Sequence, residues 1–374
     1  MIAGQRLAPV ASLARSLAGS LVASLAVTAA LLQPLTAQAA DNDALLRLER
    51  MRSAAMTGNY RGTMVFSTGG SISSARVWHY CVGDQTYERL EAQDGRQQRV
   101  LRHNDELRTY WPQTHRVVLE RRVPLAGWSA KPQAIEERAL DSYALRVEGQ
   151  ARVAGREAEV LLLEPRDALR YAQRLWTDRA TGLMLRADVL GAGNAVLETA
   201  AFSEIEIGVK PDPQRVLQDM RSIDSAPQAR AAARTGNGAA STGHGAVRSG
   251  DAVTAAAGDW RVLRPQQRST QLETEGWTMK AGVPGFRLAS CAVRGIESEG
   301  EEVSVLQAVY SDGLTHVSLF LEPYRAGRHH DAARAQLGAT RTVTRRLGEH
   351  WITVVGDAPA ATLKRFADAL EPLR

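Results

Sequence analysis

The spacing of apolar residues along the chain changes from a helical period to an alternating one near Tyr60. Upstream of it, an apolar stripe recurs every three or four residues, at Ala44, Leu48, Met51 and Ala55, which predicts a helix ending at Gly58-Asn59. From Tyr60 to Glu120, short alternating segments are separated by Gly-Gly, Gly-Asp and Asp-Gly pairs. Such segments and turns predict an antiparallel meander of strands.

Strands are predicted again farther along the chain. A less regular stretch from Pro124 to Leu145 is expected to carry a helix or a mobile loop. Alternating or apolar runs then predict strands at residues 159–164, 174–178, 183–188 and 196–207. So many consecutive strands indicate one large, strongly curved sheet or open barrel, with the helices on its concave side or at its mouth.

The composition changes abruptly after the last of these strands. Between Ser225 and Gly258 there is no aromatic residue and no Leu, Ile or Met, which predicts a flexible linker. Beyond it, strands are predicted at residues 287–294, 303–311, 315–322, 340–347 and 350–355. A closing helix, capped by Asp357 with Pro359 in its first turn, would bury Leu363, Phe366, Ala367 and Leu370.

The amino terminus has the order of a secretory signal. Residues 1–40 carry only two charges, Arg6 and Arg15, and a small-and-apolar run from Leu17 to Leu32 precedes Ala37-Gln38-Ala39. A membrane anchor is the alternative, but the run is shorter than the ~20 residues that a span needs. The predicted organisation is therefore a signal peptide (1–39), a β domain (40–222), an Ala/Gly linker (223–258) and a small α+β domain (259–374). We expect an exported, periplasmic protein.

Charge and cysteine content add little to this picture. The chain has a formal charge of +5, and without Arg6 and Arg15 it has 44 basic against 41 acidic residues, or +3. This excess indicates no nucleic-acid partner and only a modest attraction to anionic surfaces. The two cysteines, Cys81 and Cys291, fall in different predicted domains. An exported protein permits a bridge between them, but two unpaired, buried thiols are the favoured interpretation.

The motifs of common enzyme classes are absent from the sequence. There is no G-x-S-x-G, H-E-x-x-H, C-x-x-C, P-loop or G-x-G-x-x-G. His329-His330 is a poor metal chelate, because neighbours on an extended chain point to opposite faces, and His79, His103 and His115 are interpreted as ordinary sheet or turn histidines. We therefore predict no catalytic residue, no metal and no cofactor.

Two features of the strands suggest binding surfaces. The arginines Arg89, Arg99 and Arg108 form either an anion-binding face or, as we favour, the solvent side of a half-exposed sheet. An incompletely filled concave face would be a lipid-accommodating cavity, and the alternative is an ordinary core. The residues expected to line that cavity are Met64, Phe66, Trp78, Tyr80, Trp111, Leu162 and Trp176.

Several segments, taken together, resemble one family. They include Asn59-Tyr60-Arg61-Gly62-Thr63 at the first strand, Arg174-Leu175-Trp176 followed by Thr181-Gly182-Leu183, Pro284-Gly285-Phe286, and Tyr310-Ser311-Asp312-Gly313-Leu314. In this order, through both predicted domains, they resemble MucB/RseB, the periplasmic negative regulators of the sigma-E (AlgU-type) envelope stress factor. The Ala/Gly linker looks long for that family, and the resemblance does not explain Cys81 or Cys291.

The resemblance implies a fold and a mechanism. The large domain would be an unclosed, lipoprotein-carrier-like β-barrel, so the expected fold class is α+β and mostly β. The protein would bind the periplasmic part of a membrane-spanning anti-sigma factor of the RseA/MucA type and shield it from regulated proteolysis. Lipid or lipopolysaccharide would displace it, and it could form a homo-oligomer.

Which residues meet the partner is left open by the pattern. Tyr310, Asp312, Leu314 and Phe320 are candidates for contact with it, although Ser-Asp-Gly also suits an ordinary hairpin turn and the apolar residues also suit a core. The alternative function is a periplasmic lipid or lipoprotein carrier. A periplasmic hydrolase is a third hypothesis, and no sequence motif supports it.

Overall fold

The computed structural model describes residues 42–121, 135–221, 261–265, 267–298, 301–329 and 334–373. The predicted signal peptide and linker lie outside these ranges, as does much of the irregular stretch after Pro124. The chain forms two compact units, residues 1–47 and 48–374. In the first unit the described residues 42–47 are helical, with Arg47 paired to Asp43. The account below concerns the second unit.

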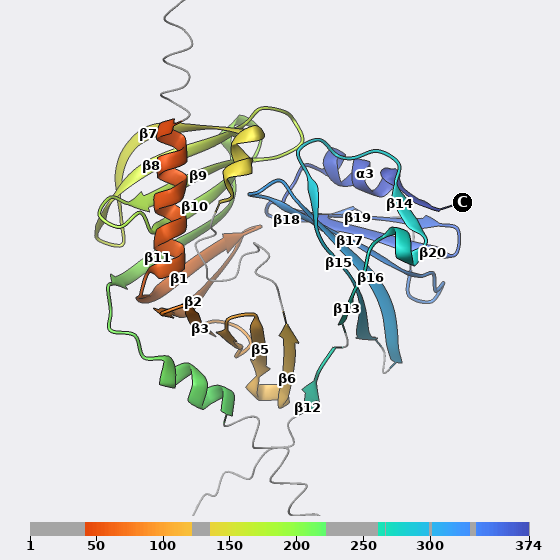
Figure 1. Cartoon of the computed structure of the whole chain (residues 1–374), viewed down its shortest axis with the longest axis horizontal. Helices are drawn as coiled ribbons and strands as arrows, with labels where there is room; N and C mark the ends of the chain where they lie inside the picture. Colours follow the sequence, from red (N-terminus) through yellow and green to blue (C-terminus); the bar gives the residue numbers. More distant parts are fainter. Residues whose placement is uncertain are drawn as a thin grey trace, which may run out of the picture. The chain divides into compact units, whose positions relative to one another are not determined.

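The first sheet contains twelve strands (Figure 1) in the order β12-β6-β5-β4-β3-β2-β1-β11-β10-β9-β8-β7. Its neighbours are antiparallel apart from β12, which runs parallel to β6. Within the described residues the sheet is unclosed, because its edge strands β12 and β7 are not paired with each other. The strands are β1 (Tyr60–Thr68), β2 (Ser71–Val82), β3 (Gln85–Ala92), β4 (Arg99–His103), β5 (Glu106–Trp111), β6 (Arg116–Arg121), β7 (Tyr143–Val153), β8 (Arg156–Pro165), β9 (Ala172–Asp178), β10 (Met184–Leu190), β11 (Val196–Ile207) and β12 (Arg261–Leu263).

The second sheet contains seven strands in the order β13-β15-β16-β17-β20-β19-β18, and β14 pairs separately with β21. The strands are β13 (Gln267–Ser269), β14 (Trp277–Met279), β15 (Arg287–Ser298), β16 (Glu301–Ser311), β17 (His316–Pro323), β18 (Arg334–Leu337), β19 (Thr340–Leu347), β20 (His350–Gly356) and β21 (Leu370–Pro372). One helix, α3 (Ala360–Ala369), packs on this sheet. The short 3-10 helices are η1 (Pro112–Thr114), η2 (Glu137–Asp141), η3 (Ala192–Asn194) and η4 (Glu273–Glu275).

Two helices pack on opposite faces of the first sheet. The helical residues 48–57 place Ala54 against Tyr60 and Val77, and Met51 against the strands β8 and β9. The helix that begins at residue 213 places Val216 and Met220 against β4, β5 and β6. Cross-strand register through β2, β3 and β4 puts this second helix on the Trp78 face and the first on the Val77 face.

The second sheet has a core of its own. Leu363, Phe366 and Ala367 of α3 are buried against β16, β17 and β20, as the predicted apolar stripe requires. Phe366 meets the rings of Phe286 and Tyr310 at centroid distances of 5.4 and 5.1 Å. The mostly β fold with an unclosed first sheet and a smaller α+β part is thus the fold class expected from the sequence.

Four local predictions differ from the structure. Strand β7 was not predicted, because its side chains are mostly half-exposed and Gly149 interrupts it at a bulge. Asp357 does not cap α3, since it accepts a hydrogen bond from Thr340 Oγ1 at 2.5 Å and Pro359 occupies the N-cap. Residues 261–263, assigned to the second domain, pair with the first sheet instead. Both cysteines are free thiols, but only Cys291 is buried.

Candidate functional site

The residues predicted to line one lipid cavity lie on both faces of the first sheet. Met64 lies opposite Ala75 on β2 and therefore shares a face with Val77, where the helical residues 48–57 pack. Phe66, two residues farther along β1, lies on that face too. Trp78 and Tyr80 alternate with Val77 and point to the other face, where both are buried although Arg76 on the same face is exposed.

The other three predicted cavity residues are dispersed. Trp111 is half-buried at the end of β5, with the guanidinium of Arg116 5.6 Å from its ring centroid. Leu162 is half-buried on β8, opposite Arg174. Trp176 carries Arg186 at 4.3 Å from its ring. The structure therefore brings Met64 and Phe66 together, and Trp78 and Tyr80 together, but not all seven; their lipid contact stays a prediction.

The strand arginines are neither a free anion-binding face nor a solvent face. Arg89 pairs with Glu91 at 2.5 Å and with Asp219 of the helix beginning at residue 213 at 2.6 Å. Arg99 approaches the same two carboxylates. Arg108 pairs with Glu106 and donates to the Met220 carbonyl at 2.8 Å. These arginines anchor the helix to the sheet, so both interpretations from the sequence were wrong.

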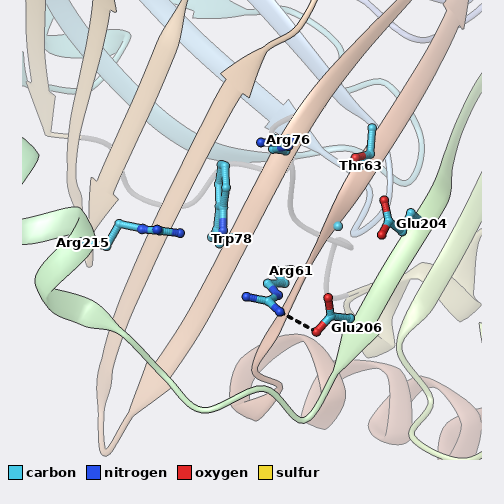
Figure 2. A pocket seen from close by; sticks show the side chains of 8 residues that line it. Arg61, Thr63, Arg76, Trp78, Glu204, Glu206 and Arg215 are labelled. Atoms are coloured by element: carbon cyan, nitrogen blue, oxygen red, sulfur yellow. Dashed lines mark hydrogen bonds and ion pairs between the residues drawn. The ribbon is translucent and has the colours of Figure 1, made fainter.

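A cavity of about 260 Å³ opens beside this helix, on the Trp78 face of the first sheet. Figure 2 shows Trp78 with arginines from β1, β2 and the helix around it, and the two glutamates of β11 along one side. Arg61 donates to Glu206 Oε2 at 2.8 Å across one end. The lining residues are Arg61, Gly62, Thr63, Arg76, Trp78, Glu204, Glu206 and Arg215.

The charges of this cavity suit an anionic group. Three arginines face two glutamates, and Arg61 is engaged by Glu206. Arg76 has no hydrogen bond or ion pair with the described residues, and Arg215 lies 5.9 Å from the Trp78 ring centroid. A carboxylate or phosphate bound by Arg76 or by Arg215 would gain charge-assisted hydrogen bonds. Trp78 would offer an apolar surface to whatever carries that anion.

A backbone irregularity shapes one wall of the cavity. The pairing of β1 with β11 shifts between Thr63 and Met64, as at a β-bulge. Gly62 lies just before the shift, and a Cβ at this position would stand 2.2 Å from the Glu204 carbonyl oxygen. The close approach of the two backbones therefore requires glycine at residue 62.

The predicted partner residues are mostly buried within the chain. Tyr310 belongs to the core beneath α3, while Leu314, 4 % exposed, lies in the cluster formed by Leu48 and residues of β8 and β9. The turn between β16 and β17 thus inserts an apolar side chain against the first sheet. Phe320 is half-buried on the face of the second sheet opposite α3, since its neighbours Leu319 and Leu321 are in the core. Partner contact by these residues stays a prediction.

Asp312 is the centre of a buried polar cluster in the same turn. Its Oδ2 accepts from Arg170 Nε at 2.8 Å and from the Tyr143 hydroxyl at 3.2 Å, and its Oδ1 accepts from the Thr315 amide at 2.7 Å. Arg170 also donates to the Pro284 carbonyl at 2.8 Å. Burial raises the pKa of Tyr143 well above its usual value, and the Asp312 charge raises it further. The cluster fixes β7, the β8–β9 connection and the second sheet in one arrangement.

A second polar contact joins the two sheets near β18 and β19. Glu198 on β11 is 4 % exposed, and its Oε1 accepts from the Ala339 amide at 3.0 Å. Burial, followed by the charge of Asp357, raises the pKa of Glu198. The Arg341 guanidinium donates to the Tyr171 hydroxyl at 2.7 Å nearby. Polar residues that were not predicted as site residues therefore connect the sheets.

Other predicted absences can be checked only in the described residues. His329 stacks on Trp351 at 5.0 Å and accepts from the Arg325 amide, whereas His330 lies outside the described residues. The described part of the chain contains no cluster of three or more metal-ligating side chains. It also contains no helix with the length and apolar character required to span a membrane.

The sequence reasoning missed the polar half of the cavity. Arg61 and Arg76 were not predicted as site residues, although each lies on the Trp78 face: Trp78 is directly opposite Arg61, and Arg76 is two residues before it on β2. Alternation within β2 places Arg76 on the same face as Trp78. Placing Arg61 on that face also requires the pairing register of β1 with β2, which the sequence does not specify.

Family models match most of the chain. The MucB/RseB N-terminal domain matches residues 43–220, and the MucB/RseB C-terminal domain matches residues 271–371. Among curated proteins, the sigma factor AlgU regulatory protein MucB of Pseudomonas aeruginosa is 29 % identical over 336 residues, which are 87 % of this chain and 90 % of that protein.

Solved structures of the same kind match over nearly their whole length. The complex of Pseudomonas aeruginosa MucA/MucB matches with a TM-score of 0.61 and 27 % identity, covering 89 % of this chain and 99 % of that chain. A crystal structure of MucB in complex with MucA(peri) matches with a TM-score of 0.59 and 26 % identity, covering 88 % of this chain and 98 % of that chain. Both relatives were therefore solved with a bound MucA.

Proposed function

Because the chain belongs to the MucB/RseB family of sigma-factor regulatory proteins, we propose that it is a periplasmic regulator of an envelope stress sigma factor. It binds the periplasmic part of a membrane-spanning anti-sigma factor of the RseA/MucA type and protects that segment from regulated proteolysis. Lipid or lipopolysaccharide is the signal that weakens this complex.

The likeness to the MucA/MucB complex is the observation that carries the proposal. It extends over 89 % of this chain and 99 % of that chain, so it includes both sheets rather than the first one alone. A lipid or lipoprotein carrier, the alternative function, would need only the first sheet. The second sheet also offers Phe320, a half-buried aromatic residue on the face opposite α3, as an anchor for a partner.

The Trp78 cavity supports the lipid part of the proposal. A lipopolysaccharide or phospholipid headgroup carries phosphate, which suits Arg76 and Arg215 at the cavity. Its acyl portion would lie against apolar surface such as Trp78. The predicted cavity residues Met64 and Phe66 lie on the opposite face of the sheet, so a lipid bound at Trp78 would not contact them.

The direct test is titration calorimetry of the purified chain with the periplasmic segment of the candidate anti-sigma factor. We expect saturable binding, and weaker binding once lipopolysaccharide is added. Resistance of the segment to the periplasmic protease should rise in the complex and fall again with lipid. Lipid uptake without partner binding would instead favour the carrier, and silence on both would refute the regulator. Sedimentation of the free chain measures the predicted self-association.

Matched variants separate the partner surface from the lipid surface. Phe320→Ala should weaken binding of the anti-sigma segment about tenfold, equivalent to about 1.4 kcal/mol. Thr353→Ala, at the position paired with Phe320 on β20, is the control. Arg76→Ala should reduce the effect of lipopolysaccharide but not partner binding, whereas Arg96→Ala removes the same charge from an exposed loop.

A further inference from the structure

A row of polar and aromatic side chains crosses four strands of the first sheet. Tyr60, His79, Glu88 and Arg102 occupy directly paired positions on β1, β2, β3 and β4. Direct pairing places all four on one face, the face on which the helical residues 48–57 pack. Cys81 lies two residues beyond His79 on β2 and therefore points to the same face.

The row places a carboxylate, an imidazole and a thiol in sequence. His79 Nδ1 lies 3.0 Å from Glu88 Oε1, and His79 Nε2 lies 3.3 Å from Cys81 Sγ. When Glu88 accepts a hydrogen bond from the protonated Nδ1 of a neutral His79, Nε2 carries no proton and is the acceptor that faces the thiol. This is the order of groups that activates cysteine nucleophiles: a nucleophile, a base and a residue that orients the base.

The imidazole is held firmly in this position. His79 is 1 % exposed, and its ring stacks on Tyr60 with the centroids 4.9 Å apart. Burial lowers the pKa of His79, but the hydrogen bonds to Cys81 and Glu88 outweigh burial, so that the net pKa is raised. Arg102 Nη1 lies 3.4 Å from Glu88 Oε2, and the positive charge of the guanidinium favours the charged form of the carboxylate.

The thiol itself can be reached from solvent. Cys81 is only half-buried, at the end of β2, where its Sγ donates to the Met56 carbonyl at 2.8 Å and its amide donates to Asn59 Oδ1 at 2.7 Å. Cys291 differs in both respects: it is buried, and burial raises the pKa of its thiol to about 11. The chain therefore contains one thiol with an adjacent base and one without.

We propose that Cys81 is a redox modification site, at which His79 and Glu88 activate the thiol toward a small hydroperoxide. The S–H bond turns from the Met56 carbonyl to His79 Nε2, which takes the thiol proton, and the thiolate attacks one peroxide oxygen. The S–O bond forms as the O–O bond breaks, and the departing alkoxide or hydroxide takes the proton from His79. Sulfur is oxidised by two electrons to the sulfenic acid, and the hydroperoxide is reduced to an alcohol or water.

The partial burial of Cys81 selects a small reagent. The Met56 carbonyl and the His79 ring contact the sulfur, and the Asn59 side chain accepts from the Cys81 amide beside it, so a hydroperoxide reaches the sulfur more readily than a bulky disulfide. Oxidation also removes the S–H group of Cys81, which donates a hydrogen bond to the Met56 carbonyl at the end of the helix. The site is independent of the proposed function, because none of its residues lines the Trp78 cavity or the turn between β16 and β17.

The test measures sulfenic acid formation in the full chain carrying Cys291→Ser. Hydrogen peroxide is the probe, and dimedone trapping followed by mass spectrometry identifies the modified residue. We expect Cys81 to react faster than glutathione under the same conditions, a comparison that needs no change at the site. A rate at or below that of glutathione overturns the proposal.

Variants then assign the rate to its cause. His79→Gln and Glu88→Gln should each slow the reaction about tenfold or more. His103→Gln is the matched control, because His103 stacks on Tyr87 at 4.7 Å much as His79 stacks on Tyr60, but alternation puts it on the other face. Thermal unfolding verifies that each variant folds. Unchanged rates in folded His79→Gln and Glu88→Gln proteins would refute the role of the base.

Discussion

Arg170 and Asp312 form an ion pair in which neither side chain is exposed to solvent, with Arg170 Nε 2.8 Å from Asp312 Oδ2. The two residues are 142 positions apart in the chain. Both are otherwise hydrogen-bonded, Arg170 to the Pro284 carbonyl and Asp312 to Tyr143 and the amide of Thr315. A buried pair costs desolvation on both sides, so its value lies in fixing which surfaces meet.

Removing one member of this pair should be strongly destabilising. Arg170→Met leaves the Asp312 carboxylate buried without its cation, and we expect a loss of about 3–5 kcal/mol in the free energy of unfolding. Urea denaturation followed by tryptophan fluorescence measures it. The double variant Arg170→Met/Asp312→Asn should lose less than the sum of the two single variants; simple additivity would show that the pair is not coupled.

Leu314 provides a test of the apolar contact made by the same turn. Leu314→Ala leaves a cavity in the cluster that contains Leu161 and Leu175, and should cost about 2–5 kcal/mol of unfolding free energy. Leu373→Ala is the control, since Leu373 is 46 % exposed and should change stability by roughly 0.5 kcal/mol or less. Equal effects of the two substitutions would contradict the packing described for Leu314.

Gly62 should not tolerate a side chain. Gly62→Ala places a Cβ 2.2 Å from the Glu204 carbonyl oxygen, so β1 and β11 must separate, at a cost of about 1–3 kcal/mol. Gly282→Ala is the control, because a Cβ at residue 282 has no atom within 4 Å. Thermal unfolding compares the two variants, and a neutral Gly62→Ala would argue against the close approach at the bulge.

His316 should make stability depend on pH. Burial lowers the pKa of His316 below its ordinary value of 6.5, although the charges of Asp312 and Glu136 oppose this and that of Arg138 supports it. The folded state then binds this proton less tightly than the unfolded state. The contribution of His316 is therefore present above about pH 6.5 and is lost as the pH falls through that value toward the folded pKa.

The measurement is the free energy of unfolding between pH 7.5 and pH 5. His316→Asn should lose less stability on acidification than the unmodified chain does. The comparison with a variant is needed because His79, whose pKa is raised, changes stability in the opposite direction.

Elements with strong local signals could be predicted from the sequence. The turns at Gly69-Gly70 and Gly83 have positive φ, as predicted hairpins require, and the stripe of α3 is buried at every predicted position. These features depend on neighbours a few residues apart. Strand β7 has no such signal, because its outward side chains and its bulge obscure the alternation.

The candidate site depended on register and on contacts between distant segments. Alternation separates Trp78 from Val77, but only the pairing of β1 with β2 puts Arg61 opposite Trp78 and His79 opposite Tyr60. Likewise, the sequence around Asp312 and Leu314 was equally compatible with a hairpin turn and with a partner surface. The structure shows that Asp312 contacts Arg170 and that Leu314 packs against the core residues of β8 and β9. Local patterns hold no information about these partners.

The first sheet is completed by strand β12, which lies far beyond the other strands of that sheet in the sequence. Residues 261–263 pair with β6 at the edge of the sheet, after the polypeptide has already completed β11 and a helix. A fragment that stops at residue 222, the end of the predicted first domain, would expose the backbone of β6. Open strand edges pair with other chains. Truncated forms of this protein should therefore aggregate or dimerise more readily than forms that extend beyond Leu263.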